Sequence, residues 1–133
     1  MERKILLVED DPDDREIIGD AFKSIQAEHL LHFEANGENA LTYVNNMFNS
    51  GNVPSLIVMD LNMPKMNGTQ TLKLLKADPR FEKIPVIIFS TSLNDLEKKQ
   101  CLELGAHSYV IKPVYFQESI DTAKSFYEIS MEL

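Results

Sequence analysis

The chain has 133 residues, of which 44% are apolar and only 5 are Gly and 6 are Pro. This length and composition predict one domain with a packed core and exclude a disordered or fibrous chain. Asp and Glu number 21 against 13 Lys and Arg, so the formal net charge is −8. Because a surface of that sign repels phosphate backbones, we expect no binding to DNA or RNA.

Membrane and secretion signals are not expected either. The longest apolar runs, such as 86–89, are far shorter than the roughly 20 residues that a membrane-spanning helix needs. The N-terminal residues 1–4 lead straight into a strand-like run, without the apolar stretch and cleavage site of a signal peptide. The single cysteine, Cys101, cannot form an internal disulfide, which is compatible with a reducing compartment. We therefore expect a cytoplasmic protein that does not bind a membrane.

Short apolar runs alternate with helical patterns along the chain. In chain order, the expected strands are 4–8, 30–35, 56–59, 86–89 and 108–111. Continuous apolar runs such as 56–59 are typical of strands buried on both faces. Between the strands, apolar residues recur at helical spacing. The stripes are Ile17, Ile18, Ala21, Phe22 and Ile25; Ala40, Leu41, Val44, Met47 and Phe48; Leu72 and Leu75; and Cys101 and Leu104.

The residues between these elements agree with the assignment. Asp11 followed by Pro12 indicates a helix N-cap with proline at the first helical position. Gly105 stands where a helix C-cap is expected, before the last strand. A strand–helix unit repeated five times predicts an α/β fold, with one doubly wound parallel sheet covered by helices on both faces.

Polar residues follow four of the predicted strands. Glu9 and Asp10 come after the first, Asp60 after the third, Ser90 after the fourth and Lys112 after the fifth. Ligands of doubly wound sheets bind beyond these carboxyl ends. Taken singly, each residue has an ordinary explanation, because a strand-end Asp often caps a helix and a lone Lys is usually solvated. If the first and third strands are neighbours, Asp10 and Asp60 lie about 5 Å apart between backbones, and Mg²⁺ would relieve their repulsion.

Four motifs in order resemble the receiver domain of two-component response regulators, over nearly the whole chain. The motifs are 8–11 (VEDD), 59–68 (MDLNMPKMNG), 89–91 (FST) and 105–106 (GA) leading to 109–113 (YVIKP). In detail the chain is similar to the small stand-alone receivers, some of which serve phytochrome-type kinases. The resemblance implies a flavodoxin-like (βα)5 fold with strand order 2-1-3-4-5, and one receiver domain over residues 1–133 with no output domain.

The resemblance also implies a chemistry. Asp60 would accept a phosphoryl group from a sensor histidine kinase or a phosphotransfer protein. Mg²⁺ would be bound by Asp10, Asp60 and the backbone carbonyl of Asn62, with Glu9 acting through water. The protein would then be a switch and not an enzyme that turns over a diffusible substrate.

The remaining motif residues would respond to the phosphoryl group. Lys112 would pair with one phosphoryl oxygen and Ser90 would hydrogen-bond another, while a cis bond before Pro113 would aim the lysine inward. Tyr109 would turn inward and repack the face made by the fourth helix, fifth strand and fifth helix. Tyr109 could equally be a partly buried strand aromatic without a switching role.

The last predicted helix carries two apolar faces. One face, expected to meet the core, comprises Phe116, Ile120, Ala123 and Tyr127; the other, about 120° away, comprises Tyr115, Phe126, Ile129 and Leu133. A second apolar face predicts a homodimer or a contact with a downstream protein, unless these are incidental hydrophobes near a terminus.

Three other functions compete with this interpretation. A pseudo-receiver would bind a partner without phosphorylation, although the acid, hydroxyl and lysine set is intact. An Asp-nucleophile phosphatase would carry the motif Asp-x-Asp at its nucleophile. This chain has Asp60-Leu61-Asn62 there and so lacks the second Asp, the general acid. A nucleotide- or flavin-binding fold is disfavoured because no glycine-rich loop follows the first strand.

Overall fold

The structure is a computed structural model that describes residues 3–132. Within that range the strands are β1 (Ile5–Val8), β2 (Leu31–Glu34), β3 (Leu56–Met59), β4 (Val86–Ser90) and β5 (Ser108–Ile111). The helices are α1 (Pro12–Ser24), α2 (Gly37–Asn49), α3 (Gly68–Ala77), α4 (Asp95–Glu103) and α5 (Phe116–Met131), with a short 3₁₀ helix, η1 (Glu28–Leu30), before β2. The predicted alternation of strands and helices is confirmed.

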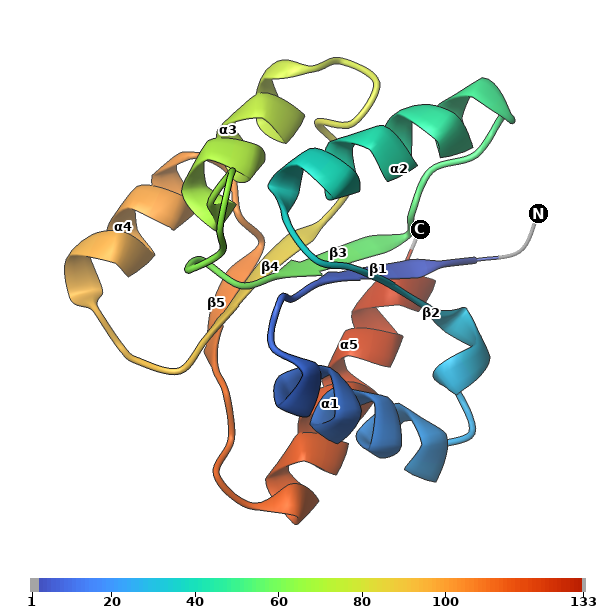
Figure 1. Ribbon diagram of the computed structural model, residues 1–133, viewed down its shortest axis with the longest axis vertical. Helices are drawn as coiled ribbons and strands as arrows, with labels where there is room; N and C mark the ends of the chain where they lie inside the picture. The colour runs from blue at the N-terminus through green and yellow to red at the C-terminus, as the bar shows by residue number, and fades with distance from the viewer. Residues whose placement is uncertain (1–2, 133) are drawn as a thin grey trace.

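The strands form one parallel sheet in the order β2-β1-β3-β4-β5, as predicted. Every residue of β1, β3 and β4 is buried, because helices cover both faces of the sheet. Figure 1 shows α1 and α5 on one face and α2, α3 and α4 on the other. β1 lies between β2 and β3, with Val8 in register with Met59. The carboxyl ends of β1 and β3 therefore lie side by side.

The core has two halves, one on each face of the sheet. On the α1 and α5 side, Phe22 and Phe126 are almost fully buried. On the other side, Leu72 of α3 and Cys101 of α4 pack in the second cluster. Two members of the predicted stripes, Ile17 and Phe48, lie at the margin and are 46% and 42% exposed. Among residues 3–132, no helix combines the length and the apolar character needed to cross a bilayer.

The helix caps lie where the sequence predicts them. The Asp11 carboxylate accepts hydrogen bonds from the backbone N–H groups of Asp13 and Asp14, which satisfies two free donors of α1. Gly105 ends the α4 segment with φ of +106°, a backbone conformation that favours glycine.

The expected orientation of the last helix is only partly right. Ala123 is buried and Ile120 packs against the core as expected, but the other two residues of that face do not. The residues of α5 that are buried are Ser119, Ala123, Phe126 and Ser130. Phe126 is only 1% exposed and packs edge-to-face on Phe89, with ring centroids 5.3 Å apart. Tyr127 and Phe116, which were expected to meet the core, are 38% and 48% exposed. The two inward serines interrupt the apolar pattern of the buried face, and for that reason the periodicity placed the centre of that face too far toward Tyr127.

The structure therefore does not support the predicted interface on α5 with the residues that were assigned to it. Its central residue, Phe126, is in the core, and Ile129 is half-buried beside the same cluster. Tyr115 is 71% exposed, and Leu133 lies outside the described residues.

The two faces of α5 are distinguished by a pair of truncations. Phe126→Ala leaves a cavity against Phe89 and should lower the free energy of unfolding by about 3–5 kcal/mol. Tyr127→Ala, one residue further along, removes a partly exposed ring and should cost about 1 kcal/mol or less. Urea unfolding followed by circular dichroism measures both. A loss for Tyr127→Ala as large as that for Phe126→Ala would contradict this orientation.

Candidate functional site

The predicted site residues meet at the carboxyl end of the sheet. Backbone hydrogen bonds extend the ladders one residue past the strands: the N–H of Asp60 donates to the carbonyl of Val8 at 3.1 Å, and that of Lys112 donates to Ser90 at 2.7 Å. Likewise, the N–H of Glu9 donates to the carbonyl of Glu34 at 2.9 Å. The backbone of each of these residues is thus held beside a neighbouring strand.

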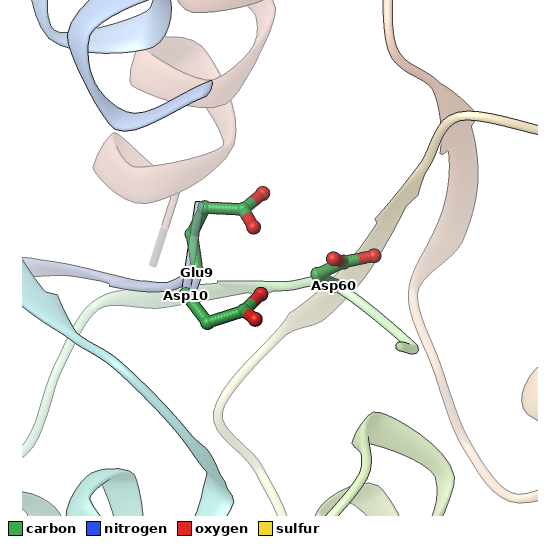
Figure 2. Close-up of side chains that lie close together, drawn as sticks. All are labelled: Glu9, Asp10 and Asp60. Atoms are coloured by element: carbon green, nitrogen blue, oxygen red, sulfur yellow. The ribbon is translucent and has the colours of Figure 1, made fainter. Parts of the chain in front are cut away.

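Three carboxylates form the acidic part of the site. Glu9, Asp10 and Asp60 each offer an oxygen, and these atoms all lie within 4.8 Å of one another. Figure 2 shows the side chains of Glu9 and Asp10, which follow β1, and of Asp60, which follows β3, gathered at the same rim. Glu9 is buried, Asp60 is half-buried and Asp10 is exposed. Because the donors are all oxygen and like-charged, the cluster could hold a hard divalent cation.

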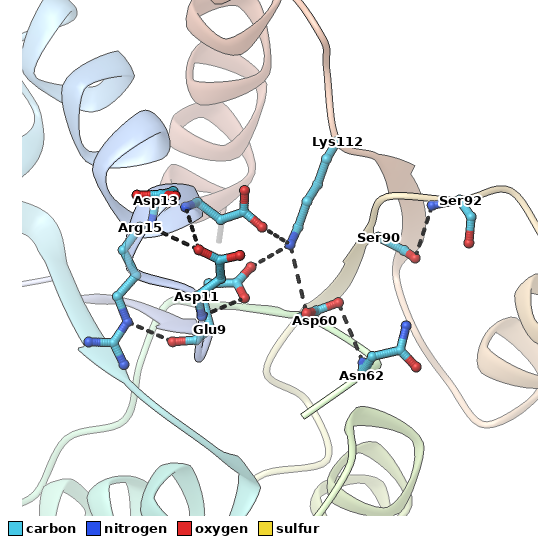
Figure 3. Close-up of polar contacts among 10 residues, drawn as sticks. Glu9, Asp11, Asp13, Arg15, Asp60, Asn62, Ser90, Ser92 and Lys112 are labelled. Carbon is cyan, nitrogen blue, oxygen red and sulfur yellow. Dashed lines mark hydrogen bonds and ion pairs between the residues drawn. The ribbon is translucent and has the colours of Figure 1, made fainter. Parts of the chain in front are cut away.

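Lys112 joins this cluster from the β5 side. Its side chain is only 9% exposed, and its ammonium lies 2.5 Å from Glu9 Oε1, 2.8 Å from Asp14 Oδ2 and 3.7 Å from Asp60 Oδ2. Figure 3 shows Lys112 reaching down to Glu9 and Asp60. The expectation of a cis bond before Pro113 is wrong, since all peptide bonds among residues 3–132 are trans. The trans form is also the one that X-Pro bonds prefer.

Burial and neighbouring charges shift the pKa values of Glu9 and Lys112 in opposite directions. Burial raises the pKa of Glu9 above its ordinary value, and the hydrogen bond from Lys112 offsets only part of that effect. Burial lowers the pKa of Lys112, but its bonds to Asp14 and Glu9 outweigh burial, so that its pKa is raised. Lys112 is therefore a firmly charged cation at the centre of the site.

The loop after β3 is held by close backbone contacts. The N–H of Gly68 donates to Leu61 O at 3.0 Å, and a Cβ on Gly68 would lie 2.3 Å from the Asp60 carbonyl oxygen. On the other side, the N–H of Gly37 at the start of α2 donates to Met66 O at 3.3 Å. The backbone N–H of Asn62 points to Asp60 Oδ1 at 3.5 Å. The segment that carries Asp60 is thus anchored to both α2 and α3.

The loop after β1 is anchored by Arg15. Its Nε donates to the Glu9 carbonyl at 2.6 Å, and its guanidinium lies over the Phe33 ring, 5.7 Å from the centroid. Figure 3 shows this arginine reaching from α1 to the backbone of Glu9. The contact holds the turn that presents Glu9 and Asp10.

Ser90 and Tyr109 both contact the loop that follows β4. Ser90 is 1% exposed, and its Oγ accepts a hydrogen bond from the Ser92 N–H at 3.4 Å. The Tyr109 hydroxyl donates to the Ser92 carbonyl at 2.9 Å, and the ring is buried. Tyr109 is therefore turned inward in this structure.

Sequence reasoning missed three residues that shape the site: Asp14, Arg15 and Gly37. Asp14 is an acid in the first turn of α1, where acids are favoured for a purely local reason. A stronger signal was available, because α1 begins directly after the strand end that carries Glu9. An acid in its first turn is therefore within reach of the same rim.

Comparisons with known proteins agree with this geometry. The family model described as the response regulator receiver domain matches residues 5–124. Response regulator Rcp1 of Synechocystis is 31% identical over 110 residues, which cover 81% of this chain and 75% of that protein. Chemotaxis protein CheY1 of Helicobacter pylori is 31% identical over 110 residues, covering 83% of this chain and 85% of that protein.

Solved structures show the same fold. The phosphorylated cyanobacterial phytochrome response regulator RcpA has a TM-score of 0.87 and 28% identity, covering 99% of this chain and 96% of its own. The Mn²⁺-bound form of Rcp1 has a TM-score of 0.83 and 26% identity, covering 98% and 95% respectively. The chain belongs to the response regulator receiver domain family.

Proposed function

We propose that the chain is a response regulator that accepts a phosphoryl group on Asp60 and signals by a change of its surface. The observation that carries the proposal is the convergence of Glu9, Asp10 and Asp60 within 4.8 Å, with the buried Lys112 beside them. An isolated group of surface acids would not need a buried cation. Receiver domains are signalling modules, and we expect no turnover of a diffusible substrate.

The donor would be a phosphohistidine on a sensor histidine kinase or a phosphotransfer protein. A carboxylate oxygen of Asp60 attacks phosphorus, a P–O bond forms, and the P–N bond to the imidazole breaks. The imidazole nitrogen keeps the electron pair, and Asp60 becomes an acyl phosphate. The Asp60 side chain lies at the rim of the sheet and is 12% exposed, and we expect the donor to reach it from that side.

The acids fit a bound Mg²⁺. Asp10 and Asp60 would ligate it directly, with the Asn62 backbone carbonyl as a further ligand and Glu9 acting through water. When bound, the cation neutralises negative charge on the phosphoryl oxygens. A solved structure of the similar Rcp1 is a Mn²⁺-bound form, which supports the binding of a divalent ion by this chain.

Lys112 and Ser90 would bind the phosphoryl oxygens that the cation leaves free. Lys112 already lies 3.7 Å from Asp60 Oδ2, so that a short movement of a flexible side chain suffices. The Ser90 hydroxyl would donate to a second oxygen, which draws the loop after β4 toward Asp60. Tyr109 is already turned inward and bonded to Ser92 in that loop. We therefore expect movement of the loop, and not an inward turn of the ring, to carry the change to the α4-β5-α5 face.

Covalent modification tests the acceptor. With acetyl phosphate and Mg²⁺, the wild-type chain should carry a phosphoryl adduct that peptide mass spectrometry maps to Asp60. Asp60→Asn should carry none, because the amide is not a nucleophile of this kind. Asp95→Asn removes an exposed acid of α4 and serves as the control with an unchanged adduct. A wild-type chain that stays unmodified with every donor would favour the pseudo-receiver alternative.

Metal affinity tests the acidic cluster. Asp10→Asn should weaken Mg²⁺ binding at least about tenfold, measured by calorimetry, because it removes a charged ligand. Without metal the same variant should be slightly more stable, since the repulsion among the acids is reduced. Equal Mg²⁺ affinity in Asp10→Asn and wild type would exclude Asp10 as a ligand.

The switch role of Tyr109 is tested separately from the chemistry. Tyr109→Ala should still be phosphorylated on Asp60, because the hydrogen bond that it removes goes to Ser92 in the loop after β4. Amide shift changes caused by beryllofluoride should shrink across α4 and β5 in NMR spectra. Tyr115→Ala, which removes a largely exposed ring, is the matched control. Unchanged shift changes in Tyr109→Ala would leave this tyrosine a structural residue only.

A further inference from the structure

The ammonium of Lys112 has three anionic neighbours, but it does not contact them equally. It carries three N–H donors, and its short contacts are Glu9 at 2.5 Å and Asp14 at 2.8 Å. Asp60 lies further away, at 3.7 Å. In this structure the lysine is therefore held toward β1 and α1, and its contact with the proposed phosphoacceptor is the weakest of the three.

Asp14 differs from the other two acids in its position. Glu9 and Asp60 follow strands and belong to the acidic cluster, whereas Asp14 lies in the first turn of α1. Pro12 and the Asp11 cap fix the start of that helix, and the Asp14 N–H points to Asp11 Oδ1 at 3.5 Å. The carboxylate of Asp14 is thereby held at the rim without taking part in the proposed metal site.

We propose that Asp14 is a positioning residue that competes with the phosphoryl group for Lys112. This inference rests on the proposed function, because it concerns the residue that binds the phosphoryl oxygen. When Asp60 carries a phosphoryl group, Lys112 moves toward the new oxygens and its bond to Asp14 weakens. Asp14 therefore destabilises the phosphorylated state relative to a chain that lacks this charge.

Exposure decides which of the two short contacts Lys112 gives up. The Glu9 side chain is 7% exposed, so its charge without the lysine would be buried and unpaired. The Asp14 side chain is 31% exposed and can be hydrated when the lysine leaves. Lys112 consequently keeps Glu9 and exchanges Asp14 for the phosphoryl oxygen.

Beryllofluoride at saturating Mg²⁺ measures this competition, with binding followed by fluorine NMR. Asp14→Asn keeps the size of the side chain and a hydrogen-bond acceptor but removes the charge. It should bind beryllofluoride about threefold to tenfold more tightly than wild type. Asp13→Asn is the matched control, since it removes the same charge from the adjacent, exposed position on α1. It should change the affinity much less.

Two further measurements separate positioning from a general effect on structure. Mg²⁺ affinity without beryllofluoride should change equally in Asp14→Asn and Asp13→Asn, because neither acid is a proposed ligand. In a Lys112→Gln background, Asp14→Asn should have no greater effect than Asp13→Asn, since the ammonium for which Asp14 competes is gone.

The outcomes distinguish this inference from the proposed function. Equal beryllofluoride affinities for Asp14→Asn and Asp13→Asn would overturn the role of Asp14 while leaving phosphorylation of Asp60 intact. An effect of Asp14→Asn that persists in the Lys112→Gln background would overturn it as well. A wild-type chain that binds no beryllofluoride with Mg²⁺ would overturn the proposed function, and the role of Asp14 with it.

Discussion

The ammonium of Lys112, buried among acids at the end of the sheet, is the interaction on which the site depends. Glu9 is as buried as the lysine, and removing one partner of such a pair leaves an uncompensated charge that costs about 3–5 kcal/mol. The pair therefore ties β5 to β1 across the rim of the sheet. The same cation is shared with Asp14 and Asp60, so any new charge on Asp60 changes the whole balance.

The surroundings of this ion pair fall into a rigid and a responsive part. Gly68, Gly37 and Arg15 hold the loops after β3 and β1 through backbone contacts that allow little displacement. On the other side, Ser90 and Tyr109 reach the loop after β4 through single hydrogen bonds to Ser92. A charge placed on Asp60 would thus meet fixed acids on one side and a lightly held loop on the other. A modification of Asp60 is therefore expected to move the loop after β4 and not the loops after β1 and β3.

The strands and the helix ends were predictable because their signals are local. Buried parallel strands read as continuous apolar runs, and the caps at Asp11 and Gly105 depend on side chains and backbone within a few residues. The rotation of α5 was not predictable from periodicity. Phe126 packs on Phe89, more than 30 residues away in sequence, and the two inward serines beside it hide the buried face from a hydrophobicity pattern.

The sequence by itself determined the fold class and the rim that carries the site residues, because each lies within two residues of the end of a strand and all the strands run in the same direction. These residues are Glu9, Asp10, Asp60, Ser90 and Lys112. Only the tertiary structure decided which of these groups touch. The contact of Lys112 with Asp14 joins residues 98 positions apart and depends on how α1 sits against the end of β5. The inward position of Tyr109 depends likewise on the loop after β4. Which side chains pair at this rim is set by the packing of helices, strands and loops against one another. The pattern of residues along the sequence does not specify that packing.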